Sequence, residues 1–281
     1  MGAMTSDPLA VAVLGRGLVD PTAPTVRADD EAVTRGRAAF ETLRVYGGRP
    51  FRLGQHLERL VQSARALGVP APDPAELEAL ARLALDAAGF VDVVLRLYWT
   101  PGPPGSAPCG YAIVSEIPDW IDEARARGQR LVALAFPRRS DAWLLPGVKS
   151  TSYATHIAAE AEARARGADD AVLVDAEGIV LEGPVTNVWW REGDTLVTPG
   201  LELGILAGET RAALCETAEV AGYVVETGAY PLARLLEADE VFTSSSVREV
   251  MPVVEVDGRA FSLGPAAAAM QGALRALVSA S

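Results

Sequence analysis

The pattern of apolar and polar positions predicts a first part of the chain that is rich in strands and contains two helices. Extended stretches on both sides of the glycine pair Gly47-Gly48 are typical of a hairpin. Apolar residues at helical spacing follow, and Asp73 before Pro74 is a typical helix start. The predicted strands are residues 9–14, 40–46, 50–53, 91–98 and 111–117, and the predicted helices are residues 55–67 and 74–88.

The second part of the chain alternates strands and helices less regularly. A polar break between Pro118 and Gly128 separates the two parts, so we place a domain boundary there, with a small domain over residues 1–118 and a larger one over 119–281. The predicted strands are residues 131–136, 171–174, 179–181, 187–190 and 240–243, and helices are predicted over 152–166, after Gly208 and from near Pro265. This order predicts a mixed α/β protein.

Composition argues against several classes of function. The 281 residues are 49% hydrophobic but contain no uninterrupted apolar stretch of the length that spans a membrane. The net charge of −12 disfavours binding to nucleic acid. With 2 cysteines and 2 histidines, neither a disulfide framework nor a metal site is expected. Residues 1–7 lack the features of a signal peptide, so we expect a cytoplasmic protein that acts on a small molecule.

The basic residues are distributed very unevenly, because Lys149 is the only lysine among 25 basic residues. Codon bias explains a preference for arginine, and a leftover surface lysine is one interpretation. Arginine cannot lose its proton near neutral pH, however, whereas a desolvated lysine amine can attack a carbonyl. The apolar segment 143–148 precedes Lys149 and a predicted helix follows it. We therefore predict that Lys149 is a desolvated nucleophile at the end of a strand.

Lys149 also lies within a series of motifs. In chain order they are Phe40-Glu41-Thr42-Leu43-Arg44 with Pro50-Phe51-Arg52-Leu53 and His56-Leu57-Glu58-Arg59-Leu60, then Gly147-Val148-Lys149-Ser150, Leu181-Glu182-Gly183-Pro184-Val185-Thr186-Asn187-Val188, the segment 203–211, and the segment 243–252. Together they resemble the fold-type IV pyridoxal-5'-phosphate (PLP) enzymes, also called class IV aminotransferases. The resemblance implies a small N-terminal α/β domain, a larger barrel-like α/β domain, PLP as cofactor, and a homodimer.

The resemblance also implies roles for individual residues. Lys149 matches the lysine that holds PLP as a Schiff base and then moves a proton between the substrate and the cofactor. Arg59 matches the arginine that binds the cofactor phosphate, and Glu182 matches the carboxylate that pairs with the pyridine nitrogen. The other cofactor-binding residues that it implies are Tyr153 near the ring hydroxyl, and Glu209, Thr210 and Ser246 at the phosphate.

The reaction that the resemblance favours is D-amino-acid transamination. The amino group would pass from a D-amino acid, with (R)-amines as further donors, to a 2-oxo acid such as pyruvate or 2-oxoglutarate. The Arg-x-His pair with which typical D-amino-acid transaminases trap the substrate carboxylate is absent. The expected substrate-binding residues are Phe40, Thr42, Tyr98 and Arg248. Arginines that could bind the carboxylate are Arg37, Arg44, Arg96, Arg138, Arg139 and Arg248.

Other functions stay open at this point. Thr42 falls where 4-amino-4-deoxychorismate lyases carry a threonine tied to the elimination of pyruvate, which yields 4-aminobenzoate. A branched-chain aminotransferase is the next alternative within the resemblance. A PLP-binding protein without catalysis is the alternative from another class, and it would show no absorbance change on addition of an amino donor.

Overall fold

A computed structural model describes residues 7–136 and 145–280 of the chain, which divides into two compact units. The first unit comprises Met1–Pro118 and Val148–Tyr153, and the second comprises Asp119–Gly147 and Ala154–Ser281. The segment that contains Lys149 therefore belongs to the first unit, whereas the predicted division had placed it in the second.

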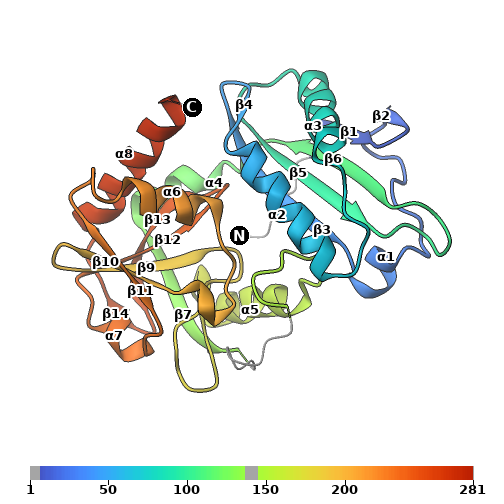
Figure 1. Ribbon diagram of the computed structural model, residues 1–281. Coiled ribbons are helices and arrows are strands. Elements are labelled where there is room, and N and C mark those ends of the chain that lie inside the picture. The colour runs from blue at the N-terminus through green and yellow to red at the C-terminus, as the bar shows by residue number, and fades with distance from the viewer. Residues whose placement is uncertain (1–6, 137–144, 281) are drawn as a thin grey trace. The chain divides into compact units, whose positions relative to one another are not determined.

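The first unit is built on a six-stranded antiparallel sheet, with two long helices packed on one face (Figure 1). The strand order is β2-β1-β6-β5-β3-β4. The strands are β1 (Ala10–Val13), β2 (Gly17–Val19), β3 (Ala39–Tyr46), β4 (Arg49–Pro50), β5 (Val93–Thr100) and β6 (Cys109–Ser115), and the helices are α1 (Glu31–Arg35), α2 (Leu53–Ala66) and α3 (Pro74–Ala88). Leu43 of β3 and Leu95 of β5 are paired in register and face the core under α2 and α3. The residues between such core positions face the other side of the sheet.

Local sequence explains where the two long helices begin. The Asp73 side chain accepts a hydrogen bond of 2.9 Å from the Ala75 amide, which caps α3 as predicted. Helix α2 begins at Leu53, immediately after Arg52, whose φ is 56°. The prediction of a strand over residues 50–53 is therefore wrong beyond Pro50, because the chain turns at Arg52 directly into the helix.

The second unit is built on an eight-stranded mixed sheet (Figure 1). Strand β7 lies parallel to both β8 and β13, and β10 lies parallel to β11. The strand order is β11-β10-β9-β12-β13-β7-β8, with β14 paired to β13. The strands are β7 (Gln129–Ala135), β8 (Asp170–Val174), β9 (Asn187–Glu192), β10 (Thr195–Pro199), β11 (Val224–Gly228), β12 (Glu240–Ser245), β13 (Glu249–Val256) and β14 (Arg259–Ala260).

Helices cover this second sheet. Helix α5 packs on β7 and β8, α6 packs on β12, and α8 packs on β12 and β13. Side chains such as Val172, Trp190 and Val241 form a separate buried core with α7. The α-helices are α4 (Trp120–Arg127), α5 (Ala154–Ala165), α6 (Glu209–Thr217), α7 (Leu232–Leu236) and α8 (Pro265–Ala280), and a short 3-10 helix, η2, spans Leu201–Leu203. The mixed α/β class predicted from the sequence is confirmed.

Three local predictions for the second unit were wrong. The stretch predicted as a polar break contains α4, in which only Ile121 and Ala124 are buried, so its apolar pattern is too short to recognise. Residues 179–181 form isolated bridges instead of a strand, through Ile179 and Val180. The helix after Lys149 begins at Ala154 and not at residue 152.

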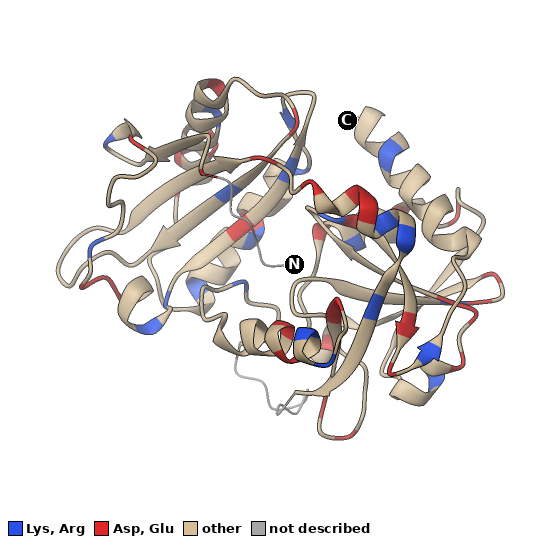
Figure 2. Cartoon of the chain, turned by 180° about the vertical axis from the view of Figure 1, so that it is seen from behind, with Lys and Arg blue, Asp and Glu red and all other residues tan. Residues whose placement is uncertain are grey.

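Charged residues are distributed over both units, with acidic and basic side chains interspersed (Figure 2). Within residues 7–136 and 145–280, no helix combines the length and apolar character that a membrane crossing requires.

Candidate active site

Lys149 lies beside β3 in the first unit, on an extended segment. Its carbonyl accepts a hydrogen bond of 3.2 Å from the Phe40 amide, and its own amide donates to Ser63 Oγ at 3.2 Å. The Nζ atom lies 4.4 Å from the centroid of the Phe40 ring and 5.9 Å from that of Tyr153. The amine therefore lies against two aromatic rings, and both the amide and the carbonyl of Lys149 are hydrogen-bonded.

The apolar surroundings of the Lys149 amine do not come from the segment 143–148, as the sequence had predicted. Leu145 and Pro146 of the apolar segment before Lys149 are exposed, and Trp143 and Leu144 lie outside the described residues. Lys149 is not in a strand either, because only the next residue, Ser150, forms a bridge, with Ala39. The apolar surroundings of the amine come from Phe40 and Tyr153 instead.

The predicted substrate residues Phe40, Thr42 and Tyr98 lie on one face of the first sheet, opposite the face under α2 and α3. Phe40 pairs in register with Tyr98, and Tyr98 pairs with Tyr111. Their rings stack at centroid distances of 5.6 Å and 4.7 Å. Burial raises the pKa of Tyr98, only partly offset by the Arg96 charge, so its hydroxyl stays protonated at neutral pH. Tyr111 extends this aromatic row and was missed from the sequence.

Arg59 is buried on α2 and is held by a carboxylate that the sequence analysis did not single out. Its Nε and Nη2 atoms donate to the two oxygens of Glu41, each at 2.7 Å. His56 Nδ1 lies 2.7 Å from Glu41 Oε2. Burial would raise the pKa of the Glu41 carboxyl, but Arg59 and His56 lower it to about 2. Arg59 is thus a preoriented cation.

A signal for Glu41 exists in the sequence. Alternate residues of β3 face the core, and Glu41 occupies one of these positions between Ala39 and Leu43. A carboxylate at a core position requires a partner. His56 and Arg59, three residues apart on the buried face of α2, supply it.

Glu182 of the second unit is oriented by the backbone of a distant loop. Its Oε2 atom accepts a hydrogen bond of 3.0 Å from the Leu206 amide. The Glu182 carbonyl accepts another, of 2.8 Å, from the Leu173 amide of β8. One carboxylate oxygen is therefore fixed by a backbone donor.

Besides Arg59, the residues predicted to bind phosphate lie in the second unit, at the start of a helix and in a turn. Glu209 and Thr210 form the first turn of α6, where Gly208 is the N-cap and no side chain caps the helix. The first amides of such a helix suit an anion. Ser246 lies in the turn between β12 and β13. In the preceding strand, the hydroxyl of Thr243 is buried and has no hydrogen-bond partner among the described residues.

The arginines considered for the substrate carboxylate differ in what already binds them. Arg37 donates to the carbonyls of Leu67 and Gly68 at 2.9 and 2.6 Å, and it also pairs with Glu31. Arg248 pairs with the buried Asp170. Arg96 Nη1 donates to the neutral hydroxyl of Ser115 at 2.7 Å, and Arg44 lies 5.2 Å from the Tyr46 ring centroid. Arg138 and Arg139 lie outside the described residues.

The residues present suit a PLP group. The first unit supplies an amine against aromatic rings, and the second supplies a fixed carboxylate and a helix N-terminus without a side-chain cap. These are the groups that an aldehyde, a pyridine nitrogen and a phosphate require. Metal-binding clusters of three or more His, Cys, Asp or Glu do not occur in the described part of the chain.

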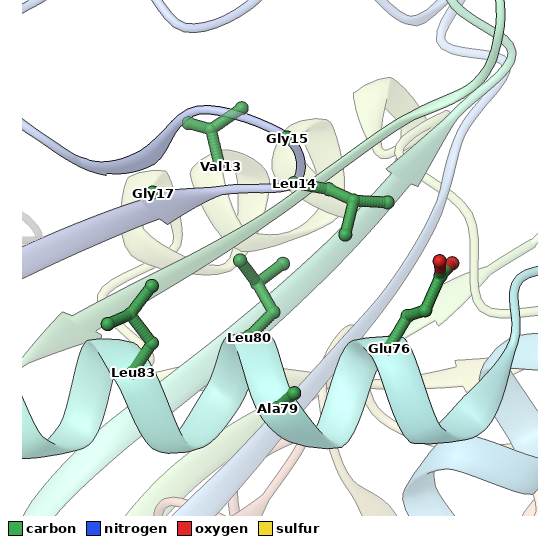
Figure 3. A pocket seen from close by; sticks show the side chains of 8 residues that line it. All are labelled: Val13, Leu14, Gly15, Gly17, Glu76, Ala79, Leu80 and Leu83. Carbon is green, nitrogen blue, oxygen red and sulfur yellow. The ribbon is translucent and has the colours of Figure 1, made fainter.

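A groove elsewhere in the first unit is unrelated to these residues (Figure 3). It has a volume of about 260 Å³, and Leu80 and Leu83 of α3 line it opposite the turn after β1. Its wall is apolar apart from Glu76, and it includes none of the predicted site residues.

Comparison with known proteins gives consistent matches over nearly the whole chain. The family described as amino-transferase class IV matches residues 38–256. The bifunctional aminodeoxychorismate lyase / D-amino acid transaminase of Mycobacterium tuberculosis is 34% identical over 273 residues, covering 92% of this chain and 94% of that protein. The fold IV-transaminase CpuTA1 of Curtobacterium pusillum has a TM-score of 0.91 at 34% identity, covering 96% of this chain and 98% of that one.

A second solved structure is similar to the same degree. It is a hypothetical aminotransferase from Mycobacterium tuberculosis, in a PLP-bound form and in a form bound to alpha-ketoglutarate and PMP. Both forms have a TM-score of 0.91 at 32% identity, covering 97% of this chain and 100% of that one.

Proposed function

Because the chain belongs to the class IV aminotransferases, we propose that it is a D-amino-acid transaminase that passes the amino group of a D-amino acid to a 2-oxo acid. The predicted family, the predicted aminotransferase activity and the predicted cofactor are confirmed, since members of this family are PLP-dependent enzymes. (R)-amines are included in the proposal as further donors, and pyruvate and 2-oxoglutarate as acceptors.

The observation that carries the proposal is the placement of the only lysine, with Nζ 4.4 Å from the Phe40 ring centroid. Bound PLP supplies an electron sink for the bonds at the substrate Cα. In the proposal Lys149 anchors the cofactor aldehyde and moves the proton at Cα. Glu182 pairs with the ring nitrogen, and Arg59, Glu209, Thr210 and Ser246 bind the phosphate, while Tyr153 lies near the ring hydroxyl.

The choice of D-amino acids and 2-oxo acids rests on similarity. The Mycobacterium tuberculosis relative is described as a D-amino acid transaminase as well as a lyase, and a similar structure is described as bound to alpha-ketoglutarate. Phe40, Thr42 and Tyr98, with Arg248 in the second unit, are proposed to contact the substrate.

Borohydride reduction tests the role of Lys149 directly. Peptide mass mapping of the reduced, cofactor-loaded protein should place the adduct on the peptide that contains Lys149, and the Lys149→Arg variant should yield none. Recovery of that peptide unmodified from fully loaded protein contradicts the assignment. A screen of L- and D-amino acids and (R)-amines, followed by absorbance, then measures the donor class and its handedness.

A second candidate function is 4-amino-4-deoxychorismate lyase. The observation in its favour is Thr42, which lies two residues along β3 from Phe40 and therefore on the same face of the sheet. The wild-type protein should be incubated with D-alanine and 2-oxoglutarate, and separately with aminodeoxychorismate. Formation of 4-aminobenzoate without D-alanine-dependent pyruvate would overturn the primary proposal in favour of the lyase.

The proposal includes a homodimer and a cytoplasmic location. Light scattering on the purified protein measures the first, and a mass of about 29.5 kDa would show a monomer instead. Fractionation of the source cells measures the second.

A further inference from the structure

Asn187 is a buried polar residue at the start of β9, and its side chain contacts a loop that lies far along the chain. It is 4% exposed. Its Nδ2 atom donates a hydrogen bond of 3.0 Å to the carbonyl of Leu206. This hydrogen bond joins the Asn187 side chain to the backbone of the loop.

The Leu206 backbone connects Asn187 to Glu182. The Leu206 amide donates to Glu182 Oε2 at 3.0 Å, while the Leu206 carbonyl accepts from Asn187. The same carbonyl accepts a hydrogen bond of 2.9 Å from the Gly208 amide. A shift of Leu206 would therefore move the amide that orients the Glu182 carboxylate.

The other end of the Asn187 amide lies against the N-cap of α6. A Cβ atom at Gly208 would lie only 2.1 Å from Asn187 Oδ1. The φ of Gly208 is −66°, an ordinary value, so glycine is required here for space and not for backbone conformation. Asn187 therefore touches both the loop residue that orients Glu182 and the residue that begins α6.

We propose that Asn187 is a positioning residue that fixes residues 206–208, and thereby orients both the Glu182 carboxylate and the N-terminus of α6 toward the cofactor. The inference rests on the proposed function, in which Glu182 serves the ring nitrogen and α6 serves the phosphate. Asparagine suits this position because its amide offers a donor for the Leu206 carbonyl and a small, flat oxygen against Gly208.

The first experiment compares binding of PLP and of pyridoxal, which lacks the phosphate, to the wild-type protein and to Asn187→Asp and Asn187→Ala. The control is Thr198→Val on the neighbouring strand β10, which also removes a buried hydrogen bond from a side chain to the backbone, to Val188 O at 2.8 Å. We expect both Asn187 variants to weaken PLP binding by about tenfold or more and pyridoxal binding by about threefold, and the control to change neither by more than about twofold.

Pyridoxal reports on the ring end of the cofactor alone, whereas PLP reports on the ring and the phosphate together. Equal losses of affinity for the two ligands would mean that Asn187 positions Glu182 only. A loss of affinity for PLP alone would mean that it positions α6 only. Either result overturns the proposed connection of the two. Binding by both variants that matches the control also overturns it.

A second pair of variants tests the contact between Asn187 and the start of α6 by adding a side chain at Gly208. Gly208→Ala alone should weaken PLP binding, because its Cβ would meet Asn187 Oδ1. The double variant Asn187→Ala/Gly208→Ala has no such clash, so its affinity should be no lower than that of the weaker single variant. Multiplied losses in the double variant would mean that the two residues act independently and would contradict the proposal.

Failure of the proposed function gives a different result. A wild-type protein that binds no PLP overturns that function and this inference together. A wild-type protein that binds PLP through Lys149, with Asn187 variants equal to the control, overturns only the role of Asn187.

Discussion

The Glu41 carboxylate accepts two hydrogen bonds of 2.7 Å from the Arg59 guanidinium, and both side chains are buried. The pairing joins β3 to the middle of α2. Paired charges in a protein interior are costly to separate, because removal of one partner leaves the other uncompensated.

Replacement of Glu41 by alanine should therefore destabilise the protein strongly. We expect Glu41→Ala to lower the free energy of unfolding by about 3–5 kcal/mol, as measured by urea denaturation. Glu78→Ala is the matched control, because Glu78 pairs with Arg82 on the exposed surface of α3. That change should cost only about 0.3–0.5 kcal/mol. Similar losses for the two variants would contradict a buried, preoriented Arg59.

The same carboxylate should make stability depend on pH. The pKa of Glu41 is lowered to about 2 in the folded protein, so the unfolded chain binds the proton more tightly. The resulting stabilisation is fully present above the ordinary pKa of a glutamate and is lost as the pH falls from about 5 through about 2. Urea denaturation across this range should show the wild type converging on Glu41→Gln. A constant difference between the two proteins would contradict the lowered pKa.

Much of the fold and of the site could be predicted, and particular residues show why. The longer strands and the two long helices of the first unit followed from apolar spacing and from caps such as Asp73, which act locally. Lys149 and Glu182 could be proposed as site residues because each lies in a short motif. Strand β13 was missed because Pro252 interrupts its pattern, and the contact between Asn187 and Leu206 depends on tertiary packing across 19 residues.

Glu249 combines an unusual backbone conformation with a buried charge. Its φ is 57°, it is fully buried, and its carboxylate binds Arg125, Gln271 and Arg275. Glu249→Gly and Glu249→Ala both lose these partners, but only glycine adopts a positive φ without cost. The free energy of unfolding of the glycine variant should thus exceed that of the alanine variant by about 1 kcal/mol. The glycine variant should also unfold at a higher temperature.

Glu255 of the same strand supplies the control for Glu249. It is partly exposed, pairs with Arg130, and has no positive φ. There glycine should be the worse substitution by about 0.5–1 kcal/mol, because it weakens a strand. The order of the glycine and alanine variants should therefore reverse between Glu249 and Glu255, and the same order at both positions would contradict strain at Glu249.

Among the arginines considered, we expect Arg96 to bind the substrate carboxylate. It pairs in register with Thr42, on the face of the sheet that carries Phe40 and Tyr98, and its Nη1 contacts the neutral hydroxyl of Ser115. Arg37 and Arg248, in contrast, are paired with Glu31 and Asp170. A hydrogen bond to a charged group contributes about 1.5–3 kcal/mol, which corresponds to roughly tenfold or more in KM. Arg96→Met should raise KM for D-amino acids by this factor.

An amine donor without a carboxylate provides the internal control for this prediction. If Arg96 binds the carboxylate, Arg96→Met should leave KM for an (R)-amine within about twofold of the wild type, because that donor never makes the contact. Arg37→Met should instead lower thermal stability, since Arg37 holds the carbonyls of Leu67 and Gly68 at the end of α2. An equal rise in KM for the two donor classes would mean that Arg96 shapes the aromatic face, and the carboxylate would then require another arginine.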